Sequence, residues 1–155
     1  MQEKTVRQSR TEQVQILTPA VMNGYRRLFG GRLMEWIDVV AAVTARRHSG
    51  KNVTTAAIDS LEFKKAARVN DTLVLIGEIS HVGKTSMEVT VRTYVEALCG
   101  RRELVNQAYV IMVAIDENER PAPVPAILPE NDGERRMLAE GRRRDALRKT
   151  RRRKA

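Results

Sequence analysis

The segment from Leu33 to Ala45 constrains the fold more than any other part of the chain, because it is almost free of polar side chains. A helical wheel, which advances 100° per residue, places one cluster on a single side: Leu33, Trp36, Ile37, Val40 and Thr44. A helix that is apolar over most of its circumference is buried on most of its sides. We therefore predict a helix over residues 31–47 that runs through the interior.

The rest of the chain is typical of an antiparallel sheet. Strands are predicted over residues 12–17, 53–63, 72–80, 85–95 and 104–115, because polar and apolar residues alternate in several of these segments. A short hairpin at 81–84 joins two of them. One long helix and about five strands indicate an α+β domain in which the sheet wraps the helix. The strand over 104–115 is apolar on both faces, so a second subunit is the simplest cover for the outer face of the sheet.

Length and charge predict one domain with appended ends. Residues 1–10 are expected to be a flexible lead-in, residues 11–130 the domain, and residues 131–155 a basic tail, partly helical or disordered. Residues 134–155 carry +8 of the net charge of +9, so the body is nearly neutral and nucleic acid is an unlikely partner for it. A single cysteine, a polar amino terminus and no apolar run of about 20 residues favour a cytoplasmic location without a membrane span.

Asp38 is the residue that most suggests chemistry. A carboxylate within an apolar helix costs free energy unless a partner or a reaction uses it. Glycines at the helix start, Gly30 and Gly31, leave backbone N–H groups open to a ligand, and the helix dipole stabilises a developing oxyanion there. Asn23 offers a side-chain amide. These groups fit hydrolysis of an activated acyl group, although Asp38 could also be a buried acceptor and Asn23-Gly24 a simple turn.

The run Asn23-Gly24-x4-Phe29-Gly30-Gly31-x-Leu33-Met34-x2-Ile37-Asp38 resembles the hotdog-fold acyl-CoA thioesterases, in particular their cytosolic acyl-CoA hydrolase branch. The similarity continues through residues 57–63, 82–89, 113–118 and 121–125. It implies a hotdog fold, in which a long central helix is wrapped by an antiparallel sheet. It also implies an acyl-CoA thioester hydrolase that forms homodimers, often assembled into hexamers as trimers of dimers.

The resemblance further implies specific roles for residues of this chain. Asp38 would be the general base or the nucleophile. Asn23 of the neighbouring subunit and the backbone N–H near Gly31 would polarise the thioester carbonyl. A second segment would lie along the coenzyme A (CoA) arm of the substrate: Gly83, Lys84, Thr85 and Ser86. No metal and no cofactor is implied, since CoA is part of the substrate.

Three alternatives remain open on the sequence. A hotdog dehydratase would need a histidine at the site, whereas His48 lies at the helix end and His81 in a hairpin. A non-catalytic acyl-CoA sensor would need neither Asn23 nor Asp38. A nucleic-acid-binding protein would use the basic tail. Lys84 could equally be a solvated hairpin lysine.

Overall fold

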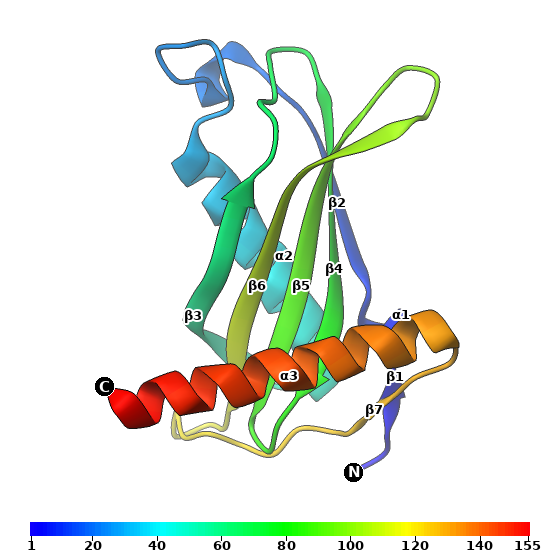
Figure 1. Cartoon of the computed structure of the whole chain (residues 1–155), viewed down its shortest axis with the longest axis vertical. Helices are drawn as coiled ribbons and strands as arrows, with labels where there is room; N and C mark the ends of the chain where they lie inside the picture. Colours follow the sequence, from blue (N-terminus) through cyan, green and yellow to red (C-terminus); the bar gives the residue numbers. More distant parts are fainter.

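A long helix, α2 (Gly30–Ser49), lies across one face of a five-stranded antiparallel sheet (Figure 1). The computed structural model describes residues 1–155. The strand order is β2-β4-β5-β6-β3. The strands span Thr11–Ile16 (β2), Asn52–Phe63 (β3), Thr72–Val82 (β4), Ser86–Glu96 (β5) and Arg102–Ile115 (β6). This arrangement confirms the predicted α+β hotdog architecture.

Helix α2 covers the predicted helix and extends it by one residue at the start and two at the end. It ends at Gly50, whose φ of 67° is the left-handed conformation that glycine adopts without strain. Leu33, Ile37 and Val40 are at most 2% exposed, as expected from the wheel. Burial on most sides is not reached within one chain, because Met34 and Val39 are 40% and 50% exposed. The part of α2 beside Asp38 therefore keeps an uncovered apolar surface.

The core lies between α2 and the inner face of the sheet. Alternate residues of β5, including Met87, Val89 and Val91, point into it and are fully buried. Strand β4 approaches the helix closely at Gly77, where an added Cβ would lie 2.6 Å from Thr44 Oγ1. The absence of a side chain at this position therefore sets how near α2 can pack to the sheet.

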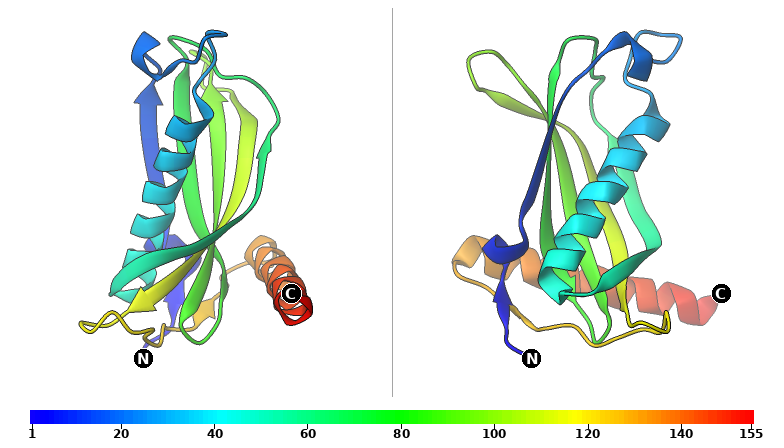
Figure 2. Two further views of the ribbon diagram at one scale, coloured as in Figure 1. Left: turned by 90° about the vertical axis from the view of Figure 1, so that its left-hand side faces the viewer. Right: turned by 180° about the vertical axis from the view of Figure 1, so that it is seen from behind.

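A second helix, α3 (Asp132–Lys154), crosses the outer face of the sheet (Figure 2). The tail, which was expected to be partly helical or disordered, is one continuous helix to Lys154. The reason is an ion cluster beneath it. Glu88 is 1% exposed and accepts hydrogen bonds from Arg144 at 2.8 Å and from Arg148 at 2.8 Å. Alternation places Glu88 on the outer face, and α3 converts that face from solvent into an interior.

Burial and hydrogen bonding act in opposite directions on Glu88. Burial raises the pKa of its carboxyl group, but the hydrogen bonds from Arg144, Ser80 and Arg148 outweigh burial and hold the pKa below its ordinary value. The helix also passes very close to the sheet at Gly141, which is buried. An added Cβ there would lie 2.0 Å from the carbonyl oxygen of Ser80.

The first ten residues are ordered, in contrast to the flexible lead-in that the sequence suggested. They contain strand β1 (Lys4–Thr5), which pairs in parallel with β7 (Ile127–Leu128), and the short helix α1 (Val6–Ser9). Val6 is 1% exposed, and this apolar anchor explains the order. A 3-10 turn, η1 (Pro19–Val21), follows β2. None of the helices has the length and apolar character needed to cross a membrane.

Candidate active site

Asp38 meets a hydroxyl group from the edge strand β3. Thr55 Oγ1 donates a hydrogen bond to Asp38 Oδ1 at 2.6 Å, and this is the one hydrogen bond that the Asp38 side chain makes. The carboxylate is only partly buried. It is therefore oriented by Thr55 while its Oδ2 atom stays open to a ligand, which is what a base or a nucleophile requires.

The first turn of α2 presents unused backbone donors. Phe29 is the N-cap and supplies no side-chain hydrogen bond, and the first turn holds no acidic residue. The backbone carbonyl of Phe29 accepts from the N–H groups of Arg32 and Leu33, whereas the N–H groups of Gly30 and Gly31 have no acceptor in the protein. Free N–H groups at a helix start attract negative charge. They are suited to a developing oxyanion.

Asn23 lies in a tight turn that leads to α2. Its Oδ1 atom accepts the backbone N–H groups of Tyr25 at 2.9 Å and Arg27 at 3.2 Å, and its own N–H donates to the Arg27 carbonyl at 2.8 Å. The carbonyl end of the side chain is thus fixed within the turn, and its exposed Nδ2 amide remains a donor. Asn23 can therefore stabilise the turn and donate to a substrate at the same time.

A cavity of about 580 Å³ opens beside Asn23 and the start of α2. It is lined by Asn23, Arg27, Leu28, Gly30, Leu33, Phe63, Lys64, Lys65, Ala66, Ala67 and Val105. Asn23 and Gly30 at the helix start therefore lie in one place. Asp38 does not line this cavity.

One chain does not bring Asp38 to the donors at Gly31. Asp38 follows Gly31 by seven residues, which is about 10 Å along the helix axis. A base must lie within about 3 Å of the water that it activates. A carbonyl held at the Gly31 amide would therefore be out of reach of the same chain's Asp38.

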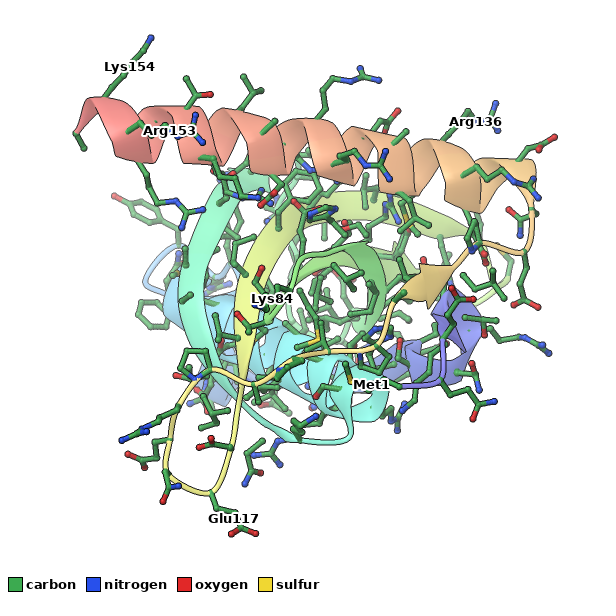
Figure 3. All side chains as sticks on the ribbon, turned by 90° about the horizontal axis from the view of Figure 1, so that it is seen from below. Met1, Lys84, Glu117, Arg136, Arg153 and Lys154 are labelled. Carbon is green, nitrogen blue, oxygen red and sulfur yellow. The ribbon has the colours of Figure 1, made fainter.

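The segment Gly83–Ser86 is nearer to Asp38 than to Gly31. It forms the turn between β4 and β5, closed by the Gly83 N–H donating to the Ser86 carbonyl at 2.8 Å (Figure 3 labels Lys84). Met87, the next residue, is in register with Met112, which is in register with Thr55. Met87 on β5 and Thr55 on β3 are therefore separated by two strand spacings, about 10 Å. The β4–β5 turn, which is the expected CoA segment, and the start of α2 lie toward opposite ends of the sheet (Figure 1).

Neither histidine takes part in this arrangement. His48 Nε2 lies 2.8 Å from the Pro125 carbonyl in the interior, and His81 Nε2 lies 3.4 Å from Asp145 beneath α3. These positions speak against a dehydratase, which would need a histidine at the reacting carbon. Thr55 was missed by the sequence analysis, and the Thr54-Thr55 pair in a strand that packs on the helix was its only signal.

Comparison with known proteins agrees with the fold. Residues 25–97 match the family model of the thioesterase superfamily. An uncharacterised acyl-CoA thioester hydrolase of Bacillus subtilis is 39% identical over 117 residues, which are 75% of this chain and 68% of that protein. A counterpart in Zymomonas mobilis is 37% identical over 81% of both chains. The mouse acyl-coenzyme A thioesterase 11 is 33% identical, but this chain spans only 22% of its length.

Solved structures extend the similarity to almost the whole chain. An apo-hexameric acyl-CoA thioesterase is 40% identical with a TM-score of 0.93 over 97% of both chains. An acyl-CoA hydrolase of Staphylococcus aureus in complex with butyryl-CoA and CoA is 33% identical with a TM-score of 0.93, over 97% of this chain and 92% of that one. The chain belongs to the thioesterase superfamily, among the acyl-CoA thioester hydrolases.

Three variants of the Staphylococcus aureus enzyme point to the same residues. Each has alanine in place of one asparagine, one aspartate or one threonine, and the three positions are separated by 15 and 17 residues. Asn23, Asp38 and Thr55 have the same order and the same separations. The residues replaced in that enzyme therefore correspond in type and spacing to the candidate site.

Proposed function

We propose that this protein hydrolyses acyl-CoA thioesters to a carboxylic acid and CoA. The observation that carries the proposal is the partly buried Asp38 carboxylate, which Thr55 orients at 2.6 Å and which keeps one oxygen free. As a general base, Asp38 removes a proton from a water molecule whose oxygen attacks the carbonyl carbon. As a nucleophile, it attacks that carbon itself and forms a mixed anhydride, which water then hydrolyses to the free acid and the Asp38 carboxylate. The carbonyl oxygen is stabilised by the N–H near Gly31 and by Asn23 Nδ2, and the CoA thiolate leaves.

The active site is shared between two chains in this proposal. One chain supplies Asn23 and the amide donors, and its partner supplies Asp38, Thr55 and the segment Gly83–Ser86 along the CoA arm. The separation of about 10 Å between Gly31 and Asp38 within one chain supports this. So does strand β3, an edge of the sheet whose Ala56 and Ala57 are exposed. Pairing of β3 with a second β3 would satisfy both edges and give a symmetric dimer.

Higher assembly is also part of the proposal. Hexameric thioesterases are among the structures that this chain resembles, and a trimer of dimers would cover the remaining apolar surface. Exposed apolar residues on edge strand β2, Val14 at 54% and Ile16 at 66%, are suited to such a contact.

A free-thiol assay tests the activity directly. The protein is supplied with acyl-CoAs from acetyl to palmitoyl, and the appearance of the CoA thiol is followed. We expect release from at least one of them, and a loss of about 10²–10⁴-fold in kcat for Asp38→Asn, the range for a positioned base. Glu35→Gln is the matched control, because Glu35 is an exposed carboxylate on the same helix that pairs with Arg32 at 3.7 Å. Turnover by Asp38→Asn at the wild-type rate would exclude the mechanism.

A further inference from the structure

The cavity beside Asn23 carries positive charge without any negative charge. Arg27, Lys64 and Lys65 line it, and no acidic residue does. The two lysines have partners outside the lining, Glu62 at 3.7 Å for Lys64 and Glu103 for Lys65. These pairs are about half exposed and so are weak and exchangeable. Arg27 takes part in none of the ion pairs of the protein.

The remaining wall of the cavity is apolar. It consists of Leu28, Leu33, Phe63, Ala66, Ala67 and Val105. An apolar wall accommodates methylene groups, and a cluster of cations at the same site accommodates a carboxylate or a phosphate. The cavity is therefore suited to a short carbon chain with an anionic end.

The backbone of Arg27 is held beside Asn23. Its backbone N–H and carbonyl both bond to Asn23, at 3.2 and 2.8 Å. Asn23 is the proposed donor to the thioester oxygen. The same turn thus carries Asn23, which would donate to the carbonyl oxygen, and Arg27, which would bind an anionic group near that carbonyl.

Distance decides which anionic group of the substrate reaches this cavity. An extended chain advances about 1.2 Å per bond. The diphosphate of CoA is fourteen bonds from the thioester carbon, or about 17 Å, whereas the terminal carboxylate of an adipoyl group is five bonds away, or about 6 Å. A compact cavity of 580 Å³ is only about 10 Å across, so the carboxylate falls inside it and the diphosphate outside.

We infer that this cavity binds the terminal carboxylate of a dicarboxylic acyl group, with Arg27 as the residue that selects it. The inference rests on the proposed thioesterase function and narrows its substrate class. The thioesters favoured by this site are therefore short monothioesters of dicarboxylic acids rather than simple fatty acyl-CoAs of the same length.

The test compares adipoyl-CoA with hexanoyl-CoA, which have equal chain length and differ in the terminal carboxylate. We expect wild-type kcat/KM to be about tenfold higher for adipoyl-CoA, the size of one charge-assisted hydrogen bond. Arg27→Ala should remove that preference through KM, so that kcat/KM becomes equal for the two thioesters. Arg26→Ala is the matched control, since Arg26 is an adjacent exposed arginine that does not line the cavity. Lys64→Ala serves as a second variant should Arg27→Ala fail to fold.

The pantetheine thioesters of the same two acids, which lack the phosphates, separate the two possible anions. If Arg27→Ala weakens both CoA thioesters equally and neither pantetheine thioester, the cavity binds phosphate and the inference is overturned. Equal wild-type kcat/KM for adipoyl-CoA and hexanoyl-CoA also overturns it, while the thioesterase function stands. Absence of thiol release from every acyl-CoA would instead refute the proposed function itself. In that case, binding of adipate and hexanoate but not of hexanol, which has the same chain length and no carboxylate, would still report the carboxylate site if it is lost in Arg27→Ala.

Discussion

Thr55 and Asp38 connect the edge of the sheet to the central helix through a hydrogen bond of 2.6 Å. They lie 17 residues apart, on β3 and α2. The hydroxyl group fixes one carboxylate oxygen and leaves the other free. A threonine on an edge strand therefore determines how the Asp38 carboxylate is presented to a substrate.

Replacing Thr55 with valine should lower activity without unfolding the protein. Valine keeps the shape and the strand preference of threonine and removes the hydroxyl group. A hydrogen bond to a charged group is worth about 1.5–3 kcal/mol, so kcat should fall by roughly 10- to 100-fold. Steady-state thiol release and circular dichroism measure the two effects. Thr54→Val, on the preceding exposed residue, is the control, and an equal loss in both variants would argue against a specific role for Thr55.

Mixing two inactive variants should restore activity if sites are shared between chains. Asn23→Ala lacks the carbonyl donor and Asp38→Asn lacks the base. A mixed dimer contains one site with both groups intact, so about a quarter of the activity per site should return in a random mixture. Thiol release after co-refolding measures it. Heterodimers shown by mass spectrometry to form, yet with no recovered turnover, would place the whole site within one chain.

Loss of the Glu88 charge should destabilise the protein. The Glu88 side chain is fully buried, and Arg144 and Arg148 are only 22% and 12% exposed. Glu88→Gln leaves the partly buried Arg144 without its carboxylate partner and Arg148 with only Asp59 and Asp145. This should cost about 3 kcal/mol, because breaking a buried ion pair is expensive. Urea denaturation measures the free energy of unfolding. Glu140→Gln, an exposed change on the helix that carries both arginines, should leave the free energy of unfolding unaltered. An unaltered value for Glu88→Gln would instead show that α3 is not docked.

The two histidines should make stability fall as the pH drops below about 6.5. Burial lowers the pKa of both His48 and His81 below the ordinary value of 6.5, against the raising effects of Pro125 and Asp145 respectively. As the pH falls, the unfolded chain therefore takes up protons at a higher pH than the folded protein does. The free energy of unfolding keeps its full value above pH 6.5 and declines as the pH falls from 6.5 toward the lower pKa values of the folded state.

Urea denaturation between pH 8 and pH 5 tests this linkage. His48→Gln should remove part of the decline, and the double variant His48→Gln/His81→Gln should remove it. Glu88 titrates at lower pH and serves as an internal reference. Its lowered pKa implies stability that is present above about pH 4.5 and is lost as the pH falls through the folded value. A decline of unchanged size in the double variant would assign the effect to other groups.

The sequence predicted the central helix and the strands well, because their signals are local. The spacing of Leu33, Ile37 and Val40 marks one helical face, and the alternation through Met87 and Val89 marks one sheet face. Asp38 was also predicted as a candidate, since a carboxylate among apolar helix residues is conspicuous. Its neighbour Thr55 was not, because threonines are common in strands and nothing local marks one that meets a helix.

The outer layer could not be predicted for a similar reason. Glu88 occupies a position that alternation assigns to solvent, and residues 131–155 have the charge density of a solvated tail. Only the folded sheet shows that Glu88 lies where α3 delivers Arg144 and Arg148. The pairing of these residues, 56 and 60 positions apart, is a property of the tertiary structure.

Gly141 has a consequence for how this helix can evolve. With a hydrogen atom in place of a side chain, α3 rests directly on the backbone of β4 near Ser80. Any bulkier residue would lift the helix and pull both guanidinium groups away from their carboxylate. The docking of α3 on the sheet thus depends on the absence of a side chain at position 141. Substitutions elsewhere along α3 are tolerated only while glycine remains there.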